Sequence, residues 1–169
     1  MANLWTTPWN FTSADQAATA AITSVVRNGL RSATVTTTLA NTFALNQVIS
    51  IQGQSGALFP WNGAYRIETI VSTTVFIVSI RDWQATLGNV GAVGNVFSVA
   101  YWGNVIYVQQ MLWDGATTGA LAITDVTGDT VWAPASPAFS GTLSYMKAEP
   151  VNGLVLNTIT SGTLQVSIH

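Results

Sequence analysis

The acidic side chains are the first residues whose types and spacing could support catalysis. Glycoside hydrolysis needs two carboxyl groups that face each other across a cleft. Only Asp125 and Asp129 stand close together in the sequence, and Gly128 lies between them. Because Asp commonly serves in turns, we interpret the pair as part of a turn. A calcium site is the alternative, although the pair lacks the spaced ligands and the Glu of an EF-hand loop.

Other residue types leave little room for nucleophilic or metal chemistry. The chain has no Cys, which removes thiolate nucleophiles and zinc–thiolate sites. Its one His is the last residue, His169, and chain ends are usually too frayed to orient a catalytic base. Ser55 lies in the sequence Gly-Gln-Ser-Gly-Ala, which departs from the Gly-x-Ser-x-Gly pattern of serine hydrolases at its final position. We therefore expect no enzyme, no catalytic residue and no metal site.

A glycine-rich stretch at residues 88–94 is superficially similar to a phosphate-binding loop. Its glycines, Gly88, Gly91 and Gly94, alternate with Asn and small apolar residues. A phosphate-binding loop needs a preceding strand and a following helix, and the P-loop also needs a Lys. The residues that follow predict a strand, and the stretch contains no Lys. We therefore expect neither a nucleotide nor any other cofactor.

Aromatic side chains are the strongest candidates for contact with a partner, because they are enriched at interface hot spots. Trp5, Trp9 and Phe11 lie in an N-terminal segment that we interpret as an extended arm reaching a neighbouring subunit. The alternative is a strand packed on its own domain. Phe59 and Trp61 lie in a loop between two predicted strands, where core packing and partner contact remain open alternatives. These five residues are the predicted partner contacts.

The composition indicates a folded chain whose surface is largely covered by partner molecules. Charged residues make up 7% of the sequence, against about 25% in an ordinary soluble protein. Apolar residues make up 49%, which is ample for a core and excludes general disorder. A free monomer normally keeps a charged surface for solubility. The simplest interpretation is a subunit of a larger assembly.

Nucleic acid and membrane are not expected as partners. The net charge is −2, and the five basic residues are scattered along the sequence, whereas binding to phosphates needs clustered Lys and Arg. Residues 83–113 carry no charge, but four glycines interrupt them. The most apolar run, residues 70–80, has the length of a strand rather than of a membrane span. Residues 1–11 lack the basic region of a signal peptide.

The pattern of the chain predicts a nearly all-β protein, because Val, Ile and Thr recur with a period of two between Gly, Asn and Asp turns. Residues 13–21 are the exception: Ser13 as a cap, Gln16 in capping-box register and five Ala predict a short helix. Asn28-Gly29 predicts a hairpin over residues 22–38. Further strands are predicted at residues 47–52, 64–71, 74–80, 96–100, 104–113, 120–125, 130–132, 140–147, 154–158 and 163–168.

Residues 22–80 resemble a small β-barrel-like module that recurs in virion proteins of tailed bacteriophages. The residues that carry the likeness are TVTTT at 34–38, LNQVISI at 45–51, WNGAYRI at 61–67 and TTVF at 73–76. The family usually has Gly-Asp before its central strand, and Asn46-Gln47 stand at that place here. The C-terminal part also resembles small phage structural domains, through MLWDGAT at 111–117, LAITD at 121–125, DTVW at 129–132, VNGL at 151–154 and SGTLQVSI at 161–168.

Four segments follow from the pattern and the resemblance together. They are an arm with a short helix at residues 1–21, a β-barrel-like module at 22–82, a Gly-rich linker or strand at 83–103 and a β-sandwich or jelly-roll-like module at 104–169. Trp113 and Trp132 fall at strand positions of the last module, where we expect core packing.

The resemblance implies a non-enzymatic structural protein of a phage virion. We expect a head decoration or cement protein that binds the lattice of the major capsid protein, or other virion subunits, on the surface of the head. A homotrimer is expected, because closed symmetry is the usual outcome of self-association. The alternative is a tail, baseplate or fibre component that binds a host glycan. A virion-associated hydrolase is the third hypothesis, and it would depend on Asp125 and Asp129.

Overall fold

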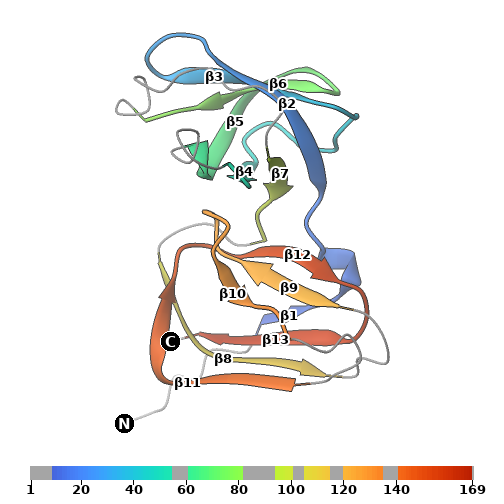
Figure 1. Ribbon diagram of the computed structural model, residues 1–169, viewed down its shortest axis with the longest axis vertical. Helices are drawn as coiled ribbons and strands as arrows, with labels where there is room; N and C mark the ends of the chain where they lie inside the picture. The colour runs from blue at the N-terminus through green and yellow to red at the C-terminus, as the bar shows by residue number, and fades with distance from the viewer. Residues whose placement is uncertain are drawn as a thin grey trace. The chain divides into compact units, whose positions relative to one another are not determined.

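The structure is a computed structural model of the chain, and it divides into two compact units (Figure 1). The described residues are 9–54, 61–81, 94–100, 105–114, 120–134 and 141–168, with the backbone alone described for 141–149. One unit, here the barrel unit, comprises Ala18–Val99 and Val126–Gly128. The other, here the sandwich unit, comprises Met1–Ala17, Ala100–Asp125 and Asp129–His169.

The barrel unit is a closed barrel of six antiparallel strands. Its strands are β2 (Thr19–Arg27), β3 (Ser32–Thr37), β4 (Val48–Gln52), β5 (Gly63–Ser72), β6 (Val75–Ser79) and β7 (Asn95–Ser98). Around the barrel the order is β2-β3-β6-β5-β4-β7. Closure removes free edges, so each of these strands has a hydrogen-bonded neighbour on both sides.

Alternating side chains fill this barrel. On β3 the burial alternates from residue to residue, and Ala33 and Val35 are fully buried. Such alternation is what a strand with one face toward a core requires. Each of the six strands contributes to the core, through Ile22 and Val25, Ala33 and Val35, Ile49 and Ile51, Tyr65 and Ile67, Phe76 and Val78, and Val96.

The sandwich unit has two antiparallel sheets with a common core. One sheet has the order β1-β13-β8-β11, formed by β1 (Trp9–Phe11), β13 (Thr163–Ile168), β8 (Ile106–Asp114) and β11 (Gly141–Val151). The other has the order β10-β9-β12, formed by β10 (Thr130–Trp132), β9 (Leu121–Thr124) and β12 (Val155–Ile159). Met111 of the first sheet and Ile123 of the second are both fully buried in this core.

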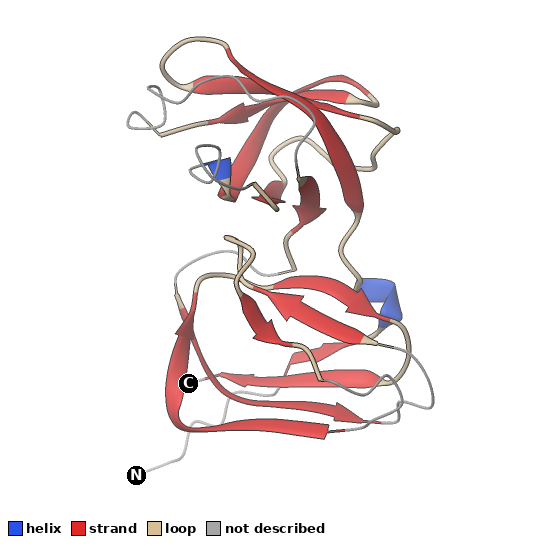
Figure 2. Ribbon diagram, viewed as in Figure 1, coloured by secondary structure: helices blue, strands red, loops and turns tan. Residues whose placement is uncertain are grey.

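The all-β prediction is confirmed, and strands dominate both units (Figure 2). The predicted helix at 13–21 is wrong beyond its first turn: a 3-10 helix, η1, covers Ser13–Asp15 only. Its cap is Thr12, whose hydroxyl accepts from the backbone N–H of Ala14, while the Asp15 carboxylate accepts from that of Thr12. From Thr19 the chain is a strand, because burial of Ala20 and Ile22 in the barrel outweighs the helix propensity of Ala.

The two units differ from the predicted segments at their boundaries. Residues 9–11 of the predicted arm form β1, which pairs with β13 inside the sandwich unit. Residues 95–98 of the predicted linker form β7, which pairs with β2 and with β4 and so closes the barrel. No helix among the described residues is long and apolar enough to span a membrane.

Two turns of the barrel unit depend on left-handed backbone. In the β2–β3 hairpin Gly29 has φ 117°, and the N–H of Asn28 donates to the carbonyl of Ser32. The predicted hairpin is therefore present, with residues 28–31 as its connection. Before β4, Asn46 has φ 65°, a conformation that Gly and Asn adopt most readily. Asn46 thus takes the conformation that a glycine would take at this turn.

Candidate interaction surfaces

Asp125 and Asp129 form a closed turn between β9 and β10. The backbone N–H of Asp129 donates to the Asp125 carboxylate at 3.0 Å, and the N–H of Asp125 donates to the Asp129 carbonyl at 2.9 Å. Each residue therefore orders the backbone of the other, which is the turn role that the sequence predicted. Within the described part of the chain, no three His, Cys, Asp or Glu residues come together as a metal site requires.

Trp61 is a core residue of the barrel unit. Its side chain is 1% exposed and lies beside the ring of Tyr65, with 6.4 Å between the ring centroids. The Tyr65 hydroxyl donates to the Trp61 carbonyl at 2.9 Å, so the polar tip of this buried ring is satisfied. The sequence left core packing and partner contact open for Trp61, and the structure shows core packing. Phe59 lies outside the described residues.

Trp9 and Phe11 pack on their own domain. Both rings are partly buried against the sandwich core, and they meet edge to face with centroids 6.5 Å apart. Trp9 lies opposite Val166 in the ladder between β1 and β13. These two residues therefore lie in a strand packed on its own domain, and not in an arm that reaches a neighbouring subunit. Trp5 lies outside the described residues.

The two tryptophans expected in the sandwich core are found there to different degrees. Trp113 on β8 is fully buried, and its indole Nε1–H donates to the carbonyl of Ser161 at 2.8 Å. Trp132 on β10 is half-buried against the same core. Among the described residues, Tyr107 is the exposed aromatic side chain, at 49%. The aromatic side chains that the structure describes therefore serve mainly as core.

Aliphatic side chains are exposed at one end of the barrel unit. We call Leu39, Leu45, Ile70 and Val71 the aliphatic end; Leu39 is 74% exposed and Val71 59%. Ile70 and Val71 lie on β5 near its turn to β6, and the two leucines lie in the loop between β3 and β4. Neither the loop at residues 38–47 nor residues 70–75 contain a charged residue.

Backbone hydrogen bonds hold the two parts of the aliphatic end together. The N–H of Asn41 donates to the carbonyl of Thr73 at 2.8 Å, and the N–H of Asn46 donates to that of Ile67 at 2.9 Å. The loop is thus tied to the β5–β6 hairpin at two points. Because its backbone is fixed, the aliphatic end is a preformed surface, and preformed surfaces lose less entropy on binding.

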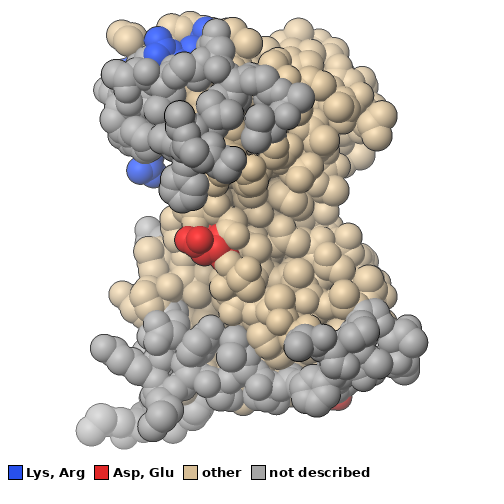
Figure 3. Space-filling view, viewed as in Figure 1, with Lys and Arg blue, Asp and Glu red and all other residues tan. Residues whose placement is uncertain are grey.

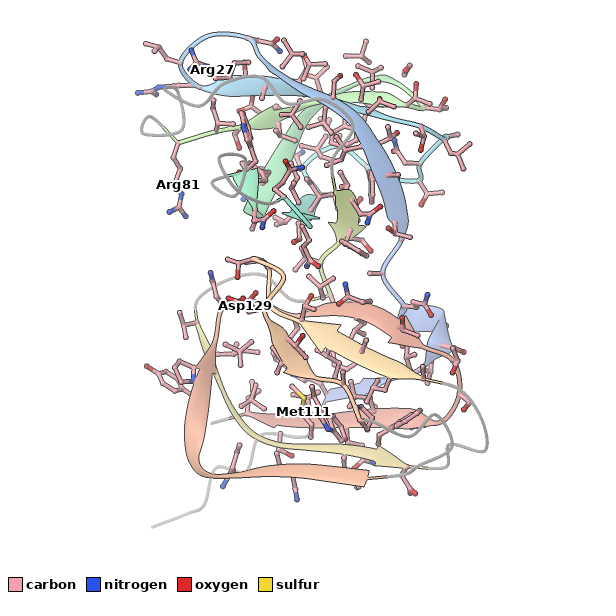
Figure 4. All side chains as sticks on the ribbon, viewed as in Figure 1. Arg27, Arg81, Met111 and Asp129 are labelled. Carbon is pink, nitrogen blue, oxygen red and sulfur yellow. The ribbon has the colours of Figure 1, made fainter. Side chains whose placement is uncertain are left out.

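Three arginines lie at another end of the same barrel. We call Arg27, Leu30, Arg31 and Arg81 the arginine tip. Arg27 ends β2, Leu30 and Arg31 lie in the turn to β3, and Arg81 follows β6. The N–H of Ile80 donates to the carbonyl of Arg31 at 2.8 Å, and Ser79 pairs with Ser32, so the end of β6 lies beside the start of β3. Figure 4 labels Arg27 and Arg81 at this end.

Sequence reasoning missed both ends of the barrel. The five basic residues look scattered along the chain, yet the fold gathers three of them at the arginine tip. In the view of Figure 3 the visible Lys and Arg atoms lie on the barrel unit, and the visible Asp and Glu atoms lie on the sandwich unit. Part of each group is local in the sequence, but only the fold brings Arg81 beside the β2–β3 turn and the loop before β4 beside the β5–β6 hairpin.

The fold and the surfaces define an all-β protein with a closed six-stranded barrel and a two-sheet unit. Comparison of the chain with protein-family models, with curated proteins and with solved structures found no match in any of the three.

Proposed function

We propose that this chain is a non-enzymatic structural subunit of a tailed-phage virion, and that it decorates the head by binding the lattice of the major capsid protein. The observation that carries the proposal is the aliphatic end of the barrel unit. There Leu39, Leu45, Ile70 and Val71 are exposed on a backbone that hydrogen bonds hold in place. Exposed aliphatic side chains on neighbouring segments support a protein–protein contact.

The physics of such a contact suits a repeated lattice. Burial of apolar surface stabilises association by about 25 cal/mol per Å², less the cost of fixing the two partners. Four aliphatic side chains give one modest contact. A symmetric shell presents the same site many times, and linked copies then bind far more tightly than one copy alone. A charged fraction of 7% supports the same proposal, because a covered surface does not need charges for solubility.

The glycan-binding alternative has less support. Sugars stack on exposed aromatic rings, and the tryptophans that the structure describes are buried or partly buried: Trp9, Trp61, Trp113 and Trp132. Tyr107, which is 49% exposed, is the one described aromatic side chain that is open to such stacking. The aliphatic end has no group that hydrogen-bonds a sugar ring through its side chain. Decoration of the head is therefore the function we put forward.

A binding measurement on stripped particles tests the proposal. Heads of the phage that carries this chain are emptied, stripped of the protein and titrated with the purified full chain. We expect saturable binding at a fixed number of sites per major capsid protein. Binding to isolated tails with none to heads would contradict the proposal and would make the tail alternative the leading one.

A further inference from the structure

The sequence contains three Asn-Gly pairs that could undergo the same covalent change. They are Asn28-Gly29, Asn62-Gly63 and Asn152-Gly153. In such a pair the backbone nitrogen of Gly can attack the side-chain carbonyl carbon of Asn, because Gly has no β-carbon to hinder the approach. The new C–N bond forms as ammonia leaves, which gives a cyclic succinimide. Water then opens the ring to Asp or to isoaspartate, in which the backbone runs through the former side chain.

The pair of Asn62 and Gly63 is held in place on both of its residues. The Asn62 Oδ1 accepts from the backbone N–H of Gln54 at 3.0 Å, and the Asn62 Nδ2–H donates to the Gln54 carbonyl at 3.2 Å. Gly63 is the first residue of β5 and pairs with Ile51 of β4. Ring closure at Asn62 therefore requires local opening of the barrel, which is costly where strands are paired.

The pair of Asn152 and Gly153 is held at its glycine. The side chain of Asn152 is exposed, but Gly153 is buried, and its N–H donates to the carbonyl of Val151 at 3.2 Å. The glycine nitrogen has to lose its proton before it attacks. A buried N–H that is already hydrogen-bonded exchanges its proton slowly, so we expect this pair to react slowly as well.

The pair of Asn28 and Gly29 is exposed on both of its residues. It lies in the turn from β2 to β3, outside the regular strands (Figure 1). Among the described residues none accepts a hydrogen bond from the N–H of Gly29, and a β-carbon placed on Gly29 would meet nothing within 4 Å. Hydroxide and water can therefore reach this nitrogen without any opening of the barrel.

One hydrogen bond restrains the reactive amide of Asn28. Its Nδ2–H donates to the hydroxyl of Thr34, on β3, at 2.6 Å. This nitrogen is the atom that leaves as ammonia, so the bond has to break before the succinimide is complete. A hydrogen bond between neutral, exposed groups is weak in net terms. It therefore slows the reaction without preventing it.

We propose that Asn28 is a site of spontaneous deamidation in the folded chain, and that its hydrogen bond to Thr34 limits the rate. Conversion makes the net charge of −2 one unit more negative and places the new carboxylate in the turn that also contains Arg31. Isoaspartate also lengthens the connection between β2 and β3 by one backbone atom. The inference goes beyond the proposed function, because it concerns covalent chemistry of this chain alone and needs no virion.

Mass spectrometry of the aged protein tests the proposal. The purified full chain is kept at mildly alkaline pH, folded in one sample and denatured in guanidinium chloride in the other, and is then digested with pepsin at acidic pH. In the folded chain Asn28 should convert at least about tenfold faster than Asn62 or Asn152, because those two pairs need local opening. In the denatured chain the three rates should lie within about threefold of one another, since the folded environments no longer differ.

Two valine variants test the role of Thr34. Thr34→Val removes the acceptor of the Asn28 amide but keeps a β-branched side chain, and it should speed conversion of Asn28 about threefold or more. The matched control is Thr36→Val, on the same face of β3, which should leave the rate within about twofold. Thermal melting shows whether each variant is folded. The comparison of the three pairs in the original chain needs no variant.

Three outcomes would overturn the proposal. Asn62 or Asn152 could convert as fast as Asn28 in the folded chain. Asn28 could stay intact in the folded chain while it converts in the denatured one. Thr34→Val and Thr36→Val could change the rate at Asn28 equally. None of these results depends on binding to heads, so failure here is distinguishable from failure of the proposed function.

Discussion

The backbone N–H of Ile80 donates a hydrogen bond to the carbonyl oxygen of Arg31 at 2.8 Å. This bond extends the ladder between β3 and β6 by one step beyond Ser32 and Ser79. As a result Arg81 lies beside the β2–β3 turn, although most of the barrel separates the two in sequence. The arginine tip is thus a product of the strand order of the barrel, and its arginines lie at the end of β2, in the turn from β2 to β3 and just after β6.

Truncation of Trp61 should strongly destabilise the barrel unit. The side chain is 1% exposed in the core, so Trp61→Ala leaves a large cavity and should lower the free energy of unfolding by about 3–5 kcal/mol. Leu39→Ala, at a residue that is 74% exposed, should change it by less than about 0.5 kcal/mol. Urea denaturation followed by tryptophan fluorescence and circular dichroism measures both. Equal costs for the two variants would show that Trp61 is not part of the core.

The Asp125 carboxylate should stabilise its turn without taking part in catalysis. Asp125→Ala removes the acceptor of the Asp129 N–H and should cost about 1 kcal/mol of stability. Asp125→Asn keeps an oxygen at the same place and should cost clearly less. Thermal denaturation of both variants gives the comparison. A glycosidase or other hydrolase activity in the purified chain that both substitutions abolish would instead support the third hypothesis.

The left-handed backbone at Asn46 gives a third prediction. Asn46 has φ 65°, a backbone conformation that Ala tolerates less well than Asn. Asn46→Ala should therefore lower the free energy of unfolding by about 1 kcal/mol. Asn46→Gly should be within about 0.5 kcal/mol of the original chain, because Gly adopts positive φ freely. Chemical denaturation of the pair measures the difference. If Gly cost as much as Ala, the side chain of Asn46 rather than its backbone conformation would be what stabilises the turn.

The aliphatic end should determine binding to stripped heads. Leu39→Ser/Val71→Ser removes two of its most exposed side chains and should weaken binding by about tenfold or more, since a few central residues carry most of an interface's energy. Val105→Ser changes a comparably exposed aliphatic residue of the sandwich unit, at 48%, and serves as the matched control. The readout is the dissociation constant from saturation binding. If Val105→Ser weakened binding equally, the aliphatic end would not be the surface that binds the heads.

Local pattern predicted most strands of this fold. The strands at 130–132 and 163–168 have the bounds that alternation and turn residues indicated, and the Asn28-Gly29 hairpin is present. The helix at 13–21 failed, because Ala20 and Ile22 gain more from burial in the barrel than Ala gains from helical backbone. Helix propensity depends on neighbouring residues alone, whereas burial in a closed barrel depends on strands that are distant in the sequence.

The candidate surfaces could not be predicted for the same reason. The segments of Leu39 and Val71 lie together only because the loop before β4 is bonded to the β5–β6 hairpin, and Arg81 follows a strand end beside Arg31 only because β3 pairs with β6. Trp61 shows the converse. Its place between two strands left core and contact equally open in the sequence, and its burial depends on how the barrel closes around it.

The copy number of this chain in purified virions tests the central claim most directly. Quantitative mass spectrometry would measure it against the major capsid protein of the same particles. A decoration protein of the head lattice should be present on the order of hundreds of copies, in a fixed ratio to the capsid protein, because each symmetric site takes one or a few copies. A dozen copies or fewer, or absence from the particles, would contradict the account.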